Sequence, residues 1–187
     1  MLKGIVKVWD SKQLPPDWFK RQQADIEATQ ALEKNVKTIV NQVRTAGDKA
    51  LLEFAFKFDG SKLASSTLRV SPEEIKEAYK KVSKEQIAAL EFMKQRVSVF
   101  QKQLLNQLEI KTFNEGILVK TVLRPIESVG CYVPGGQATY PSTVVMTVVP
   151  AKIAGVPRVV VCSPSNEEGK VNSLVLVAAD LCGVDEV

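Results

Sequence analysis

The 187-residue sequence contains no histidine at all. Histidine is the commonest metal ligand in proteins and the commonest general base at neutral pH. Proton transfer or metal binding by this chain would therefore depend on other side chains. A zinc centre also needs ligands of the right type and number. The lack of histidine therefore removes the commonest candidates for a catalytic base and for a metal ligand from this chain.

Cysteine is scarce, with three residues at positions 131, 162 and 182. The number is odd, and the spacing fits no metal-binding knuckle. Each cysteine lies in an apolar run, where a free thiol usually behaves as a small buried hydrophobe. We expect three buried free thiols, which suits a reducing cytoplasmic compartment.

Long apolar runs and strong charge are also missing. No apolar stretch approaches the roughly 20 residues that cross a bilayer, and the amino terminus lacks the apolar segment of a signal peptide. The net charge is only +4, without a basic stripe interleaved with aromatic residues of the kind that binds nucleic acid. We expect a soluble cytoplasmic protein with neither a membrane nor a nucleic acid as partner.

The first hundred residues carry helix signals. Apolar residues recur at three- and four-residue intervals from 29 to 46, and Gly47 is placed to end that helix. A second helix is predicted from 48 to 57. Serine caps followed by Glu or Gln three positions later, at 71–74 and 83–86, begin two further helices.

The last of these helices is predicted to reach about residue 105. Its apolar stripe is assigned to packing rather than to cofactor contact, and consists of Ile87, Leu90, Met93, Val97, Phe100 and Leu104. Two alternating segments then flank Asn114-Glu115-Gly116, which predicts a β-hairpin.

The pattern after residue 126 changes to alternating strands and helices. We predict, in order, a strand at 127–133, a loop at 134–142, a helix to 154, a strand at 158–162, a loop at 163–169, a helix at 170–181 and a strand start at 184–187. This order is typical of a parallel sheet. The predicted fold is α/β: a helical region (1–107), a hairpin connector (108–126) and a partial Rossmann-like parallel sheet (127–187).

Ligands of open α/β sheets bind beyond the carboxyl ends of the strands, where the two predicted loops lie. Gly135 and Gly136 let the backbone approach a ligand without a Cβ in the way, and the helix that follows offers a positive dipole end to an anion. The glycine pair is not a G-x-G-x-x-G motif. Tyr132 either stacks on a flat cofactor ring or closes the core, and the residues alone favour the core.

Three further side chains near this loop carry hydroxyl or thiol groups. Ser142 and Thr143 are expected to cap the following helix, because no base is available to activate a hydroxyl. A reactive thiolate at Cys131 would need a nearby cation or histidine. We therefore expect no catalytic role for any of the three.

The stretch 129–156, V-G-C-Y-V-P-G-G-Q-A-T-Y-P-S-T-V-V-M-T-V-V-P-A-K-I-A-G-V, resembles the corresponding segment of histidinol dehydrogenases. Further similar segments follow that family's order at 43–51, 57–59, 159–164 and 178–184. The resemblance covers essentially the whole chain. It implies NAD-dependent oxidation of L-histidinol through L-histidinal to L-histidine, the last step of histidine biosynthesis.

The resemblance also implies the site. Tyr132 is expected to contact NAD, with Pro134, Gly135 and Gly136 beside it. In the family a zinc ion is held by a glutamine, an aspartate and two histidines, and a glutamate–histidine pair moves protons. The resemblance places these residues beyond position 187, so we expect the chain alone to be inactive. The family is a homodimer, and we expect the same partner here.

Two other interpretations stay open from the sequence. One is a module without catalysis that binds NAD or another anion. The other is a helical interaction protein in which the two glycines form only a turn.

Overall fold

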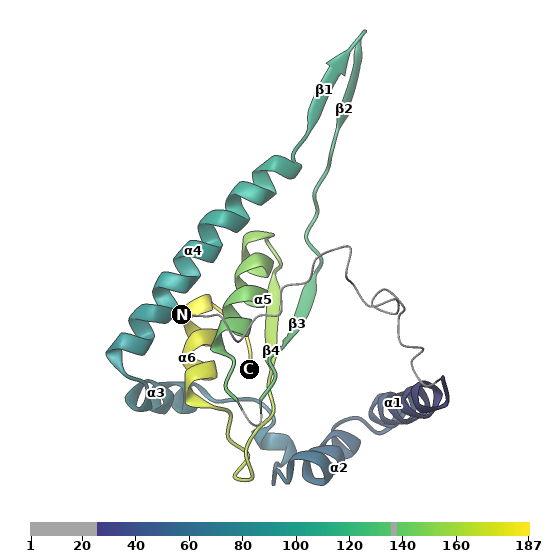
Figure 1. Cartoon of the computed structure of the whole chain (residues 1–187), viewed down its shortest axis with the longest axis vertical. Helices are drawn as coiled ribbons and strands as arrows, with labels where there is room; N and C mark the ends of the chain where they lie inside the picture. Colours follow the sequence, from purple (N-terminus) through teal and green to yellow (C-terminus); the bar gives the residue numbers. More distant parts are fainter. Residues whose placement is uncertain (1–25, 136–137) are drawn as a thin grey trace, which may run out of the picture. The chain divides into compact units, whose positions relative to one another are not determined.

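The computed structural model describes residues 26–135 and 138–187. The chain divides into two units, residues 1–47 and 48–187, and the first is described only from Ile26. Figure 1 labels the elements along the chain. In order they are α1 (Ile26–Ala46), α2 (Asp48–Asp59), the 3-10 helix η1 (Ser65–Thr67), α3 (Pro72–Lys81), α4 (Lys84–Leu108), β1 (Lys111–Asn114), β2 (Ile117–Lys120), β3 (Ser128–Tyr132), α5 (Pro141–Ile153), β4 (Arg158–Cys162) and α6 (Ser173–Cys182).

The helix end predicted at Gly47 and the helix starts predicted at Ser71 and Ser83 are confirmed. Gly47 separates α1 from α2 with a φ of +59°, a conformation that costs glycine nothing. Ser71 accepts a hydrogen bond from the Glu74 backbone, and the Glu74 carboxylate accepts one from the Ser71 backbone. Ser83 makes the equivalent exchange with Gln86 at the start of α4. None of the helices described is long and apolar enough to cross a membrane.

The predicted hairpin is confirmed as well. β1 and β2 pair antiparallel from Lys111↔Lys120 to Asn114↔Ile117. Glu115 and Gly116 both have positive φ angles, +47° and +84°, as a two-residue type I′ turn requires. Every residue of the two strands is exposed.

The carboxyl-terminal part of the chain contains the parallel sheet. β3 pairs with β4 in register from Ser128↔Arg158 to Tyr132↔Cys162. Glu186 adds a parallel bridge to Val160 on the far side of β4. The predicted parallel pairing is therefore confirmed, while the third strand expected from residue 184 is present only as this single bridge.

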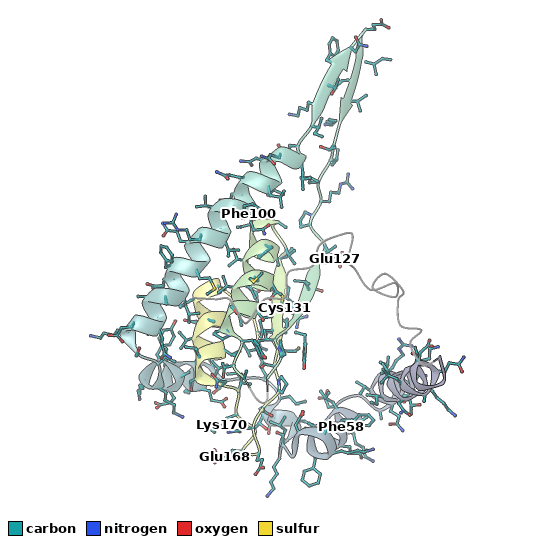
Figure 2. All side chains as sticks on the ribbon, in the orientation of Figure 1. Phe58, Phe100, Glu127, Cys131, Glu168 and Lys170 are labelled. Atoms are coloured by element: carbon teal, nitrogen blue, oxygen red, sulfur yellow. The ribbon has the colours of Figure 1, made fainter. Side chains whose placement is uncertain are left out.

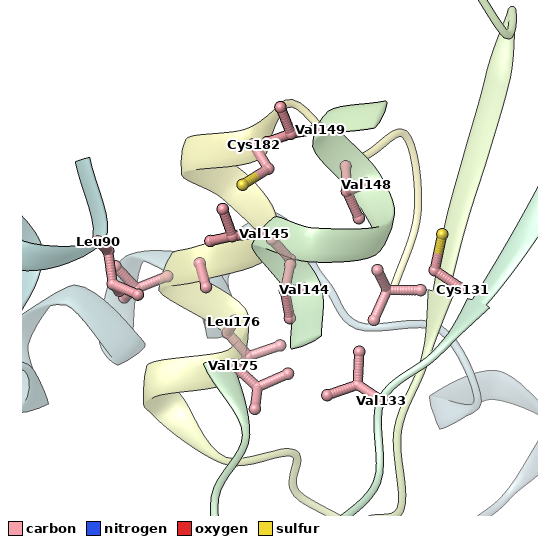
Figure 3. Packing of buried hydrophobic residues seen from close by; sticks show 14 of the residues in the cluster. Leu90, Cys131, Val133, Val144, Val145, Val148, Val149, Val175, Leu176 and Cys182 are labelled. Carbon is pink, nitrogen blue, oxygen red and sulfur yellow. The ribbon is translucent and has the colours of Figure 1, made fainter. Parts of the chain in front are cut away.

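One hydrophobic core joins the sheet to α3, α4, α5 and α6. α5 contacts β3, β4, α4 and α6, and α3 packs on α6 (Figure 1). Valine dominates the centre of this core (Figure 3). The fully buried residues include Val133, Val144, Val145, Val148, Val159, Val161, Val175 and Val177. This packing fixes where β3 and β4 end, and with them the two loops that carry the candidate site.

The apolar stripe of α4 divides into two halves. Leu90 is buried and Val97 packs against the core, as the assignment to packing predicts. Phe100 is 62% exposed and Leu104 is also exposed (Figure 2). The second half of the stripe therefore leaves an apolar surface uncovered within unit 2.

Candidate functional site

Tyr132 is the last residue of β3, and its side chain is 65% exposed. Its neighbours Cys131 and Val133 are buried. The Val133 backbone donates to the Cys162 carbonyl oxygen at 2.8 Å, so pairing with β4 continues one residue past the strand. The aromatic ring is thus held by a fixed backbone at the carboxyl end of β3, while the ring itself stays in solvent. The interpretation that this ring closes the core is wrong.

The loops after β3 and β4 meet at Gly135 and Pro164. A Cβ added to Gly135 would lie 3.4 Å from Pro164 Cδ and 3.6 Å from Pro164 Cβ and Cγ. These are ordinary van der Waals distances, so the exposed loop backbone at Gly135 lies against the proline ring with room left for a Cβ. Pro134 is half-buried beside it. Gly136, the fourth predicted cofactor residue, lies outside the described residues.

The helix that follows this loop begins earlier than expected. Tyr140 is the N-cap of α5 and makes no side-chain capping bond, and Pro141 occupies the first turn. The prediction that Ser142 and Thr143 cap the helix is wrong, since both lie inside its first turn. Proline favours this position because its fixed φ matches the helix and its missing N–H would have no partner there. The amino end of α5 keeps a positive dipole end without a capping side chain, which favours an anion.

The three cysteines are free, and they differ in exposure. Cys131 and Cys182 are buried as predicted, whereas Cys162 is exposed at the end of β4, so its predicted burial is wrong. Cys162 lies opposite Tyr132 in the last parallel pair of the sheet, where the core ends. Burial raises the pKa of the Cys182 thiol to about 11, and nearby Lys94 offsets only part of that effect.

The segment after β4 is held on two sides. On one side, the hydroxyls of Ser61 and Ser165 are 2.7 Å apart, and Ser61 is only 1% exposed. On the other side, the Asn172 amide donates to the Thr139 hydroxyl at 3.1 Å. The turn between them carries Glu168 and Lys170 (Figure 2).

Reasoning from the sequence missed both Ser61 and Asn172. Asn172 could have been found, since an asparagine before the apolar run of α6 is a typical N-cap. The role of Ser61 depends on a contact with a residue 104 positions away, which no local pattern reveals.

The described residues do not fit a zinc centre. Across residues 26–135 and 138–187, no group of three or more histidine, cysteine, aspartate or glutamate side chains is arranged to hold a metal ion. The sequence also has no histidine. No metal ligand is therefore assigned to these residues.

Comparison with known proteins gives one consistent match. The family model described as histidinol dehydrogenase matches residues 20–187. Similar curated proteins include the histidinol dehydrogenases of Clostridium acetobutylicum, 43% identical over 154 residues, and of Caldanaerobacter subterraneus subsp. tengcongensis, 44% identical over 154 residues. Each alignment covers 82% of this chain and 35% of the relative.

A solved structure agrees with these relatives. The crystal structure of histidinol dehydrogenase from Elizabethkingia anophelis matches with a TM-score of 0.74 and 35% identity, over 82% of this chain and 35% of that chain. This chain therefore spans about a third of the length of the proteins that it matches.

Proposed function

We propose, from the premise that this chain belongs to the histidinol dehydrogenase family, that it forms the NAD-binding part of an enzyme that oxidises L-histidinol. The reaction proceeds through L-histidinal to L-histidine, in histidine biosynthesis. The chain spans 35% of the length of its relatives, so we assign the oxidoreductase activity to a longer protein. The chain alone is proposed to be inactive. Its three free thiols support a reducing, cytoplasmic setting.

The observation that carries this proposal is the exposed ring of Tyr132 beside the bare backbone of Gly135. NAD accepts hydride from the substrate when it is bound. In our proposal Tyr132 stacks on a flat ring of the dinucleotide. Pro134, Gly135 and Gly136 bring the backbone close to it, and the uncapped start of α5 faces the negative charge of the phosphates.

Zinc is not part of this proposal for the chain itself. The resemblance implies zinc in the whole enzyme, but the described residues contain no suitable group of ligands. We therefore assign no zinc ligand and no catalytic proton transfer to residues of this chain.

A calorimetric titration of NAD into the purified chain tests the cofactor site. Replacement Tyr132→Ala should weaken binding roughly tenfold, the effect of losing about 1.4 kcal/mol of stacking. Phe56→Ala is the matched control, because Phe56 is a similarly exposed aromatic residue (61%) on α2, outside the loop. Equal affinity in wild type and Tyr132→Ala would contradict the proposed site. Absence of NAD binding in every variant would favour the interaction-protein alternative.

We also propose that the chain assembles as a homodimer. Support comes from apolar side chains that stay exposed in the second unit, on the end of α4, the hairpin and the segment after it. They include Phe100, Leu104, Leu108, Ile110, Phe113, Ile117, Leu118, Val119, Val122, Leu123 and Ile126. Many exposed apolar side chains on consecutive elements are typical of an interface.

Sedimentation velocity tests this assembly. Phe113→Lys combined with Leu118→Lys should convert a dimer to a monomer, since each change places a charge in a dry contact. Glu53→Lys, on the exposed surface of α2, is the control for added charge. A wild type that sediments as a monomer at all concentrations would contradict the dimer.

A further inference from the structure

We propose that Asn172 is a positioning residue for the nucleotide site: its side chain holds the loop after β3 in the conformation that NAD requires. This inference rests on the proposed function. Of this loop, the structure describes residues 133–135 and 138–140. Asn172 itself lies 32 or more residues away along the chain and belongs to another element, the start of α6.

The orientation of the Asn172 amide is fixed by α6. Its Oδ1 accepts a hydrogen bond from the Leu174 backbone at 2.9 Å, as an N-cap residue does. Because that oxygen is engaged, the Nδ2 group must face away from the helix end. It donates to the Thr139 hydroxyl at 3.1 Å. One side chain therefore ends α6 and restrains the loop at the same time.

The bond from Asn172 restrains the loop at Thr139, close to its end. Thr139 immediately precedes Tyr140, the N-cap of α5. Restraining Thr139 therefore restrains how the loop enters α5, a helix whose direction is already set by its packing in the core. The other end of the loop is fixed by the backbone bond from Val133 to Cys162 and by the packing of Gly135 on Pro164. Of these three restraints, only the one at Thr139 is made by side chains alone.

The segment that supports Asn172 is itself anchored. Ser165 bonds to the buried Ser61, and the Lys62 backbone donates to the Glu167 carbonyl oxygen at 3.4 Å. The side chain of Leu63 lies over Gly169, where an added Cβ would come within 2.9 Å of Leu63 Cδ2. The contact from Asn172 therefore joins the loop to a fixed support. A loop ordered before binding loses less entropy when the ligand arrives.

Two substitutions remove this restraint without touching the core, because Asn172 and Thr139 are both exposed. Asn172→Ser keeps a good N-cap for α6, but its side chain is too short to reach Thr139. Thr139→Val removes the acceptor and keeps the shape. Each should raise the Kd for NAD about two- to tenfold, the range of one net hydrogen bond. The double variant should bind as each single variant does, because both remove the same interaction.

The control is Asn166→Ser in the same segment. Asn166 accepts bonds from the Glu168 and Lys170 backbones within its own turn, so NAD affinity should not change. Amide hydrogen exchange measured by NMR on the ligand-free chain gives a second readout. The Thr143 amide donates to the Tyr140 carbonyl oxygen where the chain enters α5, so its exchange should speed up in Asn172→Ser and stay unchanged in Asn166→Ser.

The outcomes separate the two proposals. Unchanged exchange at Thr143 in Asn172→Ser would overturn the inference. Faster exchange with an unchanged Kd for NAD would overturn it too, because Asn172 would then serve the fold and not the site. If the wild type binds no NAD, the proposed function fails, and the exchange rates still decide whether Asn172 holds the loop.

Discussion

Removing the Ser61 hydroxyl should destabilise the second unit measurably. Among the residues whose side chains are described, Ser61 is the one polar residue that is buried, at 1% exposure. Its hydroxyl lies 2.7 Å from that of half-buried Ser165. Ser61→Ala leaves the Ser165 hydroxyl without this partner, which costs about 1–3 kcal/mol. For a chain of this size that corresponds to a fall in Tm of roughly 2–12 °C.

The assay is urea unfolding followed by circular dichroism. Ser61→Ala/Ser165→Ala should recover part of the loss, because removing both partners of a buried hydrogen bond can be nearly neutral. The resulting double-mutant cycle should give a coupling of about 1 kcal/mol. Ser66→Ala, on an exposed residue of η1, should stay within about 0.5 kcal/mol of wild type. A loss of less than about 0.5 kcal/mol in Ser61→Ala would show that this hydrogen bond does not stabilise the fold. The same conclusion would follow if the losses in Ser61→Ala and Ser165→Ala added up to the loss in the double variant.

Three other predictions concern charge, thiols and activity. A hydrogen bond from Lys152, together with one from the Val159 backbone N–H, lowers the pKa of the Asp185 carboxyl. The stability that ionised Asp185 contributes is therefore present at neutral pH and is lost as the pH falls through this lowered pKa. Asp185→Asn should flatten the acid limb of a plot of Tm against pH, and an unchanged limb would contradict this role. A thiol reagent should modify Cys162 in the native chain and leave Cys131 and Cys182 unmodified, as mass spectrometry would report. The purified chain with NAD, zinc and histidinol should form no NADH; sustained formation, with host enzyme excluded, would refute the proposed inactivity.

Local features were predictable from the sequence because short-range sterics and hydrogen bonds determine them. The capping pairs at Ser71 and Ser83 and the turn at Glu115-Gly116 are of this kind. The strand at 158–162 was predicted with its observed bounds, since β-branched residues lie between Pro157 and Pro164. The division into regions 1–107, 108–126 and 127–187 stays a prediction.

Features that depend on distant neighbours were not predictable. Cys162 stands in an apolar run, yet it is exposed because the core ends where the last strand pair ends. Tyr132 is exposed for the same reason, and the resemblance rather than the residue pattern pointed to it. The sequence offers two adequate starts for α5, one at Pro141 and one after Ser142. The helix begins at Pro141, so Ser142 lies inside its first turn.

The parallel pairing of β3 with β4 has a consequence for synthesis on the ribosome. The hairpin of β1 and β2 is local, so it can close in microseconds once it has emerged. β3 finds its partner strand only about 30 residues later, which at typical translation speeds is roughly 2–6 s. During that interval the edge of β3 and the apolar faces of α5 are uncovered on a growing chain. A nascent polypeptide is therefore exposed to chaperones, and to mispairing with neighbouring chains, until β4 has emerged to pair with β3 and α6 has emerged to cover α5.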